Sequence, residues 1–242
     1  MSTGTVWGVG LGPGDPDLMS LRADRLLRET RHVAYFRKAG RKGHARQIAQ
    51  GLLRADVVEF PMEYPVTTEI PVADPAYNTQ LSSFYARVSD HLAGLAAGGE
   101  DVVVLCEGDP FFYGSFMHLH SRLNGRVPVQ VVPAITGMSA AWTATDMPIT
   151  WGDDVLTVLP ATLSEDELTT RIADSDAVVV MKIGTNMPKL RAALARAGRV
   201  DDTWLVQYAS QSGERVMKLT EAETDRAPYF TIALIHGQGR RP

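Results

Sequence analysis

Three short stretches of the sequence are rich in glycine, proline and aspartate, and each follows an apolar run. They are Gly10-Leu11-Gly12-Pro13-Gly14, Gly108-Asp109-Pro110 and Pro133-Ala134-Ile135-Thr136-Gly137. Residues of these types form tight turns whose backbone can approach a ligand closely. Because ligands of open α/β sheets bind at the carboxyl ends of strands, we expect the three turns to converge on one binding site.

The first stretch lacks the spacing of the common nucleotide-binding motifs. No glycine follows five residues after Gly8, Gly10 or Gly12, as the dinucleotide fingerprint requires, and the chain has no Gly-Lys pair for a P-loop. Gly8-x-Gly10-x-Gly12 fits the looser turn of Rossmann-like methyltransferases, but Val6 stands where those enzymes usually carry an acid. The motif alone therefore leaves two interpretations open, a ligand-binding turn and a turn that binds nothing.

A basic segment covers residues 37–46, with five Arg or Lys residues, one His and no acid. Guanidinium and ammonium groups form charge-assisted hydrogen bonds with carboxylates. The segment therefore predicts a site for an acidic ligand, and the alternative is a solvated loop.

Histidine and cysteine do not suggest a metal site. His118 and His120 are two residues apart, so on a helix they face different sides. Cys106 is the only cysteine and lies in an apolar run, which predicts a buried thiol and excludes a disulfide framework. We expect no metal.

Hydrophobic periodicity predicts the elements that must position these turns. Asp15 and Pro16 are typical of a helix start, with Leu18, Leu21 and Leu26 on one face. A loop with four prolines over residues 61–78 suggests a lid. Helices are expected after residue 15, from 45 to Gly51, from 81 to Gly98, after 137, from 165 and from 187 to Gly198, and strands at 6–10, 32–36, 56–60, 101–106, 127–132, 154–162, 177–184, 203–210, 215–219 and 229–237.

Length, charge and composition limit the classes of protein to which the chain could belong. The 242 residues carry a net charge of −4, so no general attraction to nucleic acid is expected. The apolar runs are too short to span a membrane. We expect a cytoplasmic protein with two α/β layers joined near residues 148–153.

The turns in order resemble the motif set of the tetrapyrrole methylases, which use S-adenosylmethionine in corrinoid and sirohaem synthesis. The similar segments are GVGLGPGDPDLMSLRADRLLRE, EGDPFFYGS, PAITGMSAAW and VVVMKIG, and they run nearly from end to end of the chain. The resemblance implies the class III methyltransferase fold, with α/β domains at 1–149 and 150–242, an active-site cleft between them, and a homodimer. Ala134 replaces the glycine of the family's Pro-Gly-Ile-Thr turn.

The resemblance also implies roles for individual residues. Pro13 would shape the substrate trough, and the basic segment would bind the substrate through Arg37, Lys38, Arg41, Lys42, His44 and Arg46. The residues implied for S-adenosylmethionine are Gly108, Asp109, Phe112, Thr136, Gly137, Met181, Ala209, and Thr231 or Ala233.

Within the family, AYFRKAGRKGHARQIAQGLL and EFPMEYPVTTEIP resemble the branch that methylates precorrin-2 at C-20. That reaction gives precorrin-3A in aerobic cobalamin synthesis and releases one proton. His44, Glu107 and Tyr113 are candidates for the base, and water is the alternative. Three hypotheses compete with this one. The enzyme could carry out the same reaction on cobalt-factor II, or it could be a methyltransferase of this fold that acts on a protein histidine or on ribosomal RNA. The third hypothesis is a non-catalytic module that binds a tetrapyrrole.

Overall fold

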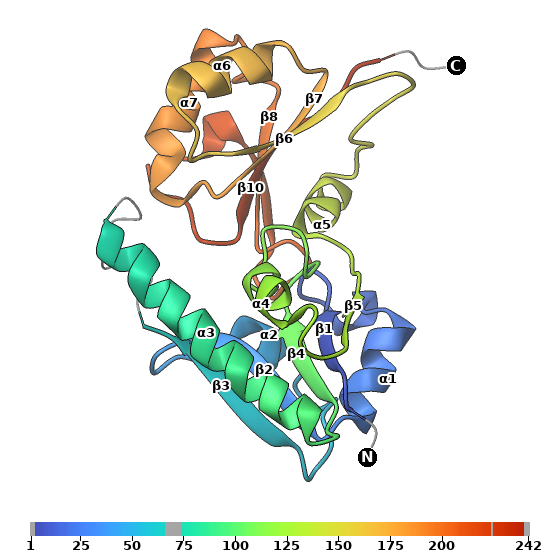
Figure 1. Cartoon of the computed structure of the whole chain (residues 1–242). Helices are drawn as coiled ribbons and strands as arrows, with labels where there is room; N and C mark the ends of the chain where they lie inside the picture. The colour runs from blue at the N-terminus through green and yellow to red at the C-terminus, as the bar shows by residue number, and fades with distance from the viewer. Residues whose placement is uncertain (1–2, 66–73, 224, 240–242) are drawn as a thin grey trace. The chain divides into compact units, whose positions relative to one another are not determined.

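The computed structural model describes residues 3–65, 74–223 and 225–239. The chain divides into two compact units, Met1–Thr136 and Gly137–Pro242 (Figure 1). This division comes earlier in the chain than the boundary expected at 149. The physical reason is that the helix Gly137–Ala144 packs on the second sheet through Ala140 and Ala141, which share a buried cluster with Ile232 and Leu234.

The elements alternate between strands and helices along most of the chain. The first unit contains β1 (Val6–Gly10), α1 (Leu21–Glu29), β2 (His32–Lys38), α2 (His44–Ile48), β3 (Val58–Tyr64), α3 (Pro75–Ala97), β4 (Val102–Cys106), α4 (Phe116–Leu123) and β5 (Val129–Val132). The second contains α5 (Gly137–Ala144), β6 (Leu156–Pro160), α6 (Glu165–Ala173), β7 (Ala177–Met181), α7 (Met187–Arg196), β8 (Thr203–Gln207), β9 (Arg215–Lys218) and β10 (Thr231–Ile235).

The first sheet has the strand order β3-β2-β4-β1-β5, and all its pairings are parallel. Every residue of β4 is buried, as a central strand with helices on both faces requires. One face packs against α3 and α4, and the other against α1 and α2 (Figure 1). Because the strands are parallel, their carboxyl ends all lie at one edge, which we term the first carboxyl edge.

The second sheet has the order β6-β7-β10-β8-β9. β6 and β7 are parallel, whereas β10 runs antiparallel to both β7 and β8. The ends of β6, β7 and β8 therefore lie at one edge together with the start of β10, which we term the second carboxyl edge. α6 and α7 cover one face of this sheet, and α5 covers the other (Figure 1).

The first helix does not begin where the sequence predicts. Asp15 accepts a hydrogen bond from the Asp17 N–H and opens only a 3-10 turn, Pro16–Leu18. The chain is extended again at Met19, and Ser20 caps α1 by accepting from the N–H of Ala23. The expected apolar face is also wrong, because Leu18 and Leu21 are 37% and 84% exposed. Ala23 and Leu27 face the core instead.

The Pro-rich stretch is more regular than the sequence suggests. β3 continues to Tyr64, and Pro61 is tolerated because β3 is an edge strand. α3 already begins at Pro75, with Asp74 as its cap. The central part of the expected lid, residues 66–73, lies outside the described residues. α2 is shorter than expected and ends at Ile48. Within the described ranges, no helix is both long and apolar enough to cross a bilayer.

Candidate active site

The turns that follow β1 and β4 are joined directly at the first carboxyl edge. The N–H of Leu11 donates to the Cys106 carbonyl at 2.9 Å, and the N–H of Gly108 donates to the Gly12 carbonyl at 2.8 Å. Gly12 and Gly108 thus form an isolated antiparallel bridge beyond the ends of two parallel strands. Pro13, the residue expected in the substrate trough, is buried next to this bridge.

The turn after β5 closes on the same place around Gly10. A Cβ atom at Gly10 would lie 2.5 Å from the Ala134 Cβ and 2.7 Å from the Gly108 carbonyl oxygen. No side chain fits at such distances, so the convergence of the three turns depends on glycine at this position. The predicted meeting of the three turns is confirmed.

Asp109 holds two of these turns together. One carboxylate oxygen accepts from the N–H of Phe111 at 2.8 Å, within the same turn. The other accepts from the N–H of Ala134 at 3.0 Å, in the turn after β5. Each carboxylate oxygen can accept a further hydrogen bond. Asp109 therefore has a structural role that the sequence analysis missed, and it retains acceptor capacity for a ligand.

Glu107 lies at the same edge and faces α2. One oxygen of its carboxyl group accepts from the N–H of Ala45 at 3.1 Å. The residue reaches solvent, but the protein around its carboxyl group displaces much of the water that would stabilise the charged form. This desolvation raises the pKa of Glu107 to about 7, and the bond from Ala45 opposes the shift. Partial desolvation of its ring by the surrounding protein lowers the pKa of the neighbouring His44.

The segment after Asp109 presents aromatic side chains. The rings of Phe112 and Tyr113 lie 4.9 Å apart. Tyr113 is 42% exposed and has a φ of 55°, in the left-handed region that side chains of this size rarely adopt. The Tyr64 hydroxyl is hydrogen-bonded to that of Ser115, which ties β3 to this segment.

Two cations of the basic segment form ion pairs with carboxylates of β3. Arg37 pairs with Glu63 at 2.6 Å, and Arg46 forms a bidentate pair with Glu59, both distances being 2.8 Å. Lys38, Arg41, Lys42 and His44 are exposed. Two of the expected substrate cations are therefore already neutralised. The partners Glu59 and Glu63 were not predicted from the sequence; they lie on β3 beside β2, with Glu63 directly opposite Arg37 in the register.

In the second unit, three of the expected cofactor residues lie at the second carboxyl edge. Met181 ends β7, Ala209 follows β8, and Thr231 begins β10. Thr231 is 2% exposed, and its hydroxyl oxygen has no hydrogen-bond partner among the described residues. Ala233 lies further into β10, where it joins the apolar core against α6 and α7. Of the two alternatives on β10, Thr231 is the one at the edge.

Residues with a left-handed backbone conformation lie next to these positions in the chain. Lys182 follows Met181 with a φ of 57°, while Tyr208 and Ser210 flank Ala209 with φ values of 53° and 58°. Strained residues of this kind gather at functional sites in many proteins. Their residue types do not indicate a positive φ, so these conformations were not predicted from the sequence.

Thr136 and Gly137 lie where the first unit ends and the second begins. Thr136 is half-buried in the turn after β5, and Gly137 is the first residue of α5. A Cβ atom at Gly137 would meet Ile232 Cδ1 at 3.7 Å, an ordinary contact. The start of α5 thus lies next to β10, at Ile232, which directly follows Thr231 in the chain.

His118 and His120 point to different partners, as their spacing predicts. The His118 ring packs on Tyr85 with centroids 4.6 Å apart, whereas the His120 ring packs edge-on against Phe111 at 4.8 Å. Among the described residues, no group of three His, Cys, Asp or Glu could hold a metal ion.

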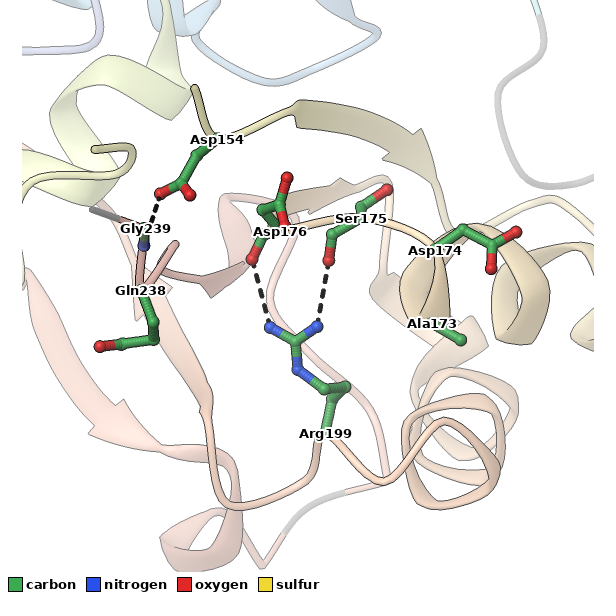
Figure 2. A pocket seen from close by; sticks show the side chains of 8 residues that line it. All are labelled: Asp154, Ala173, Asp174, Ser175, Asp176, Arg199, Gln238 and Gly239. Atoms are coloured by element: carbon green, nitrogen blue, oxygen red, sulfur yellow. Dashed lines mark hydrogen bonds between the residues drawn. The ribbon is translucent and has the colours of Figure 1, made fainter. Parts of the chain in front are cut away.

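Two cavities lie within the units. One, of about 560 Å³, is lined by residues 17–20 and 133–135 of the first unit, beside the converging turns. The other, of about 390 Å³, lies in the second unit and contains Asp154, Asp174, Asp176 and Arg199 (Figure 2). Here Arg199 donates to the carbonyls of Ser175 and Asp176, and Asp154 accepts from two backbone N–H groups. These groups hold local turns, so this second cavity offers less to a ligand.

Comparisons with known proteins find relatives over most or all of the chain. Residues 5–225 match the family of tetrapyrrole (corrin/porphyrin) methylases. A precorrin-2 C(20)-methyltransferase from Sinorhizobium sp. is 48% identical over 100% of this chain and 99% of its own length. A cobalt-precorrin-2 C(20)-methyltransferase from Salmonella typhimurium is 25% identical, covering 97% of both chains.

A solved structure shares the fold. The uroporphyrin-III C-methyltransferase of Thermus thermophilus, in complex with S-adenosyl homocysteine, superimposes with a TM-score of 0.67 and 24% identity, over 96% of this chain and 97% of its own. The family match and the full-length relative lead to one conclusion. The chain belongs to the tetrapyrrole methylases, a family of S-adenosylmethionine-dependent methyltransferases.

Proposed function

We propose that the protein transfers the methyl group of S-adenosylmethionine to C-20 of precorrin-2, giving precorrin-3A and S-adenosylhomocysteine in aerobic cobalamin synthesis. The observation that carries this proposal is the 48% identity to a precorrin-2 C(20)-methyltransferase over the whole chain. Identity to the relative named for the cobalt-loaded substrate is 25%, which favours the metal-free tetrapyrrole.

The chemistry needs positioning more than reactive side chains. The sulfonium methyl of the cofactor is already activated, and the reduced tetrapyrrole offers an electron-rich meso carbon. The protein must hold the two about 3 Å apart and exclude water. Rigid turns built from backbone hydrogen bonds suit that task. The joined turns around Gly10 are of this type.

We propose that S-adenosylmethionine contacts the residues that the family resemblance implies. Those of the first unit are Gly108, Asp109, Phe112 and Thr136, and those of the second unit are Gly137, Met181, Ala209 and Thr231. A buried hydroxyl without a partner is costly, so Thr231 fits a ligand that can hydrogen-bond to it. Adenine and ribose both offer such groups.

A pair of glycine variants tests the role of the turns. Gly10→Ala places a Cβ against Ala134 and should abolish binding of S-adenosylmethionine in calorimetry. Gly94→Ala is the matched control, because nothing lies within 4 Å of a Cβ at that helical position. Circular dichroism must show that the Gly10 variant is folded. A folded Gly10→Ala protein with normal cofactor affinity would remove the turns from the site.

For the substrate, we propose that Arg41, Lys42 and Lys38 bind carboxylates of precorrin-2, while Arg37 and Arg46 mainly brace the segment. Pro13 and the cavity of about 560 Å³ beside it would contact the apolar ring system. The decisive assay measures S-adenosylhomocysteine formed with metal-free and with cobalt-loaded substrate separately. Turnover of the cobalt form alone would reverse the substrate assignment.

We also propose that the protein is a cytoplasmic homodimer. An exposed apolar side chain on α1 supports a partner surface on the first unit, because Leu21 is 84% exposed. Sedimentation equilibrium should give twice the chain mass of 26.4 kDa. A Leu21→Glu variant at the same concentration should shift the equilibrium toward monomer if this surface is used, and a monomeric wild-type protein would end the proposal.

A further inference from the structure

Methylation at a meso carbon leaves a proton to be removed. An electron pair of the tetrapyrrole forms the new carbon–carbon bond, and the bond between sulfur and methyl breaks with its electrons going to sulfur. The methylated carbon then carries both hydrogen and methyl, and the ring system holds the positive charge. Loss of that hydrogen as a proton restores the conjugation. The reaction therefore needs one proton acceptor near C-20.

The carboxylates on β3 and in the turn after β4 differ in what already occupies them. Glu59 and Glu63 are paired with Arg46 and Arg37. Asp109 uses both oxygens for backbone N–H groups. Glu107 alone among these four has one oxygen engaged by a single N–H, that of Ala45, and carries no ion pair among the described residues. Of the four, Glu107 is thus the carboxylate that combines the absence of an ion pair with an oxygen that has no hydrogen bond among the described residues.

The position of Glu107 is fixed by the strand that precedes it. Along β4, Val104 and Cys106 face the cluster under α3 and α4, while Val103 and Leu105 face the cluster under α1 and α2. Alternation puts Glu107 on the second of these faces, just beyond the last buried residue. The N–H of Ala45 then holds the carboxyl group, directly before the Gly108–Asp109 turn.

We propose that Glu107 is the general base that takes the C-20 proton after methyl transfer and passes it to solvent. This proposal rests on the proposed function, because it presumes methylation at C-20. Proton removal by a side chain requires an acceptor that is charged at working pH but still basic. The residue also reaches solvent, so the proton has a way out.

The titration of this site can be assigned from its neighbours. The pKa of Glu107 is raised to about 7 by desolvation. Burial raises the pKa of the Cys106 thiol, which therefore stays neutral, and partial desolvation lowers the pKa of the exposed His44. The elements around Glu107 carry Asp109 in its own turn, Arg46 on α2 and Arg37 on β2, each engaged in the contacts described above.

Glu107→Gln is the main test, because the glutamine carbonyl can still accept from the N–H of Ala45. We expect kcat with precorrin-2 to fall by on the order of 10²–10⁴-fold. Affinities for S-adenosylmethionine and precorrin-2, measured by calorimetry, should stay within about two-fold. With deuterium at C-20, the variant should show a primary isotope effect larger than that of the wild type, because proton removal becomes rate-limiting.

Two further variants separate a base from a structural role. Glu107→Asp keeps a carboxylate and should recover part of kcat. In a pH profile, the wild-type rate should rise with pH through the region of 7, and this rising limb should be absent from the Gln variant. His44→Gln tests the competing candidate base in the same way, and this variant should keep the rise of rate with pH. A fully active Glu107→Gln enzyme, or loss of the limb in His44→Gln, would overturn the proposal. If the wild type does not methylate precorrin-2 at C-20, the function itself fails instead.

Discussion

Replacing Asp109 should weaken cofactor binding through the turns that its carboxylate joins. Asp109→Ala removes the acceptor for the N–H of Phe111 at 2.8 Å and for the N–H of Ala134 at 3.0 Å. A hydrogen bond to a charged group contributes about 1.5–3 kcal/mol when buried. Asp109 is only half-buried, so we expect about 2–3 kcal/mol for the two bonds together.

Part of this loss should appear in cofactor affinity, because the ligand must then order turns that the native protein holds ready. We expect the Kd for S-adenosylmethionine to rise by roughly ten- to a hundred-fold, at about 1.4 kcal/mol for each factor of ten. Asp109→Asn keeps an oxygen for Phe111 but sets an NH₂ group against the N–H of Ala134. Its effect should lie between wild type and Ala.

Titration calorimetry and urea unfolding together measure both effects. Asp74→Ala is the matched control, because Asp74 makes the same local bond, to the N–H of Ala76 at 2.8 Å, and has no cross-turn partner among the described residues. It should lower stability slightly and leave the Kd unchanged. If Asp109→Ala loses stability but binds the cofactor normally, the joined turns are not part of the cofactor site. If Asp109→Asn equals wild type, the bond to Ala134 is irrelevant.

Two other predictions concern the basic segment. The double variant Arg41→Ala/Lys42→Ala should raise KM for the tetrapyrrole about three- to ten-fold at low salt and leave cofactor affinity unchanged. Arg25→Ala/Arg87→Ala makes the same charge change on α1 and α3 and should alter neither quantity. Equal effects of the two pairs would mean only general attraction. Glu59→Gln tests the pair with Arg46, whose hydrogen bond is the main cause that lowers the pKa of Glu59 below its ordinary 4.5. The pair therefore stabilises the fold above pH 4.5 and loses this effect as pH falls through the lowered value. We expect Glu59→Gln to cost about 1–2 kcal/mol in urea unfolding at pH 7 and much less at pH 3, and a constant cost would contradict this origin.

The buried strands and their turns could be predicted from the sequence because several principles agree there. β4 is a continuous apolar run, and the Gly-Asp-Pro turn follows it at once. A parallel sheet puts such turns on one edge, so their convergence followed from the pattern alone. The bond between Asp109 and Ala134 did not, because it depends on how far apart two turns from distant parts of the chain come to lie.

Helix boundaries and ion pairs were harder to predict from the sequence, for reasons that the structure identifies. Asp15-Pro16 is an equally good start for a 3-10 turn and for a helix, and only the Ser20 cap decides where α1 begins. The basic segment looks unpaired in the sequence because Glu63 lies 26 residues after Arg37. Their contact requires the parallel register of β2 and β3, which the sequence pattern does not specify.

The most direct test of the account is the position of the transferred methyl group. The protein is incubated with metal-free precorrin-2 and S-adenosylmethionine labelled with ¹³C in the methyl group, and the product is examined by NMR. We expect a single new methyl signal coupled to C-20, with one S-adenosylhomocysteine formed per methyl. A labelled methyl on another ring carbon, or no transfer while the cobalt-loaded substrate is methylated, would contradict it.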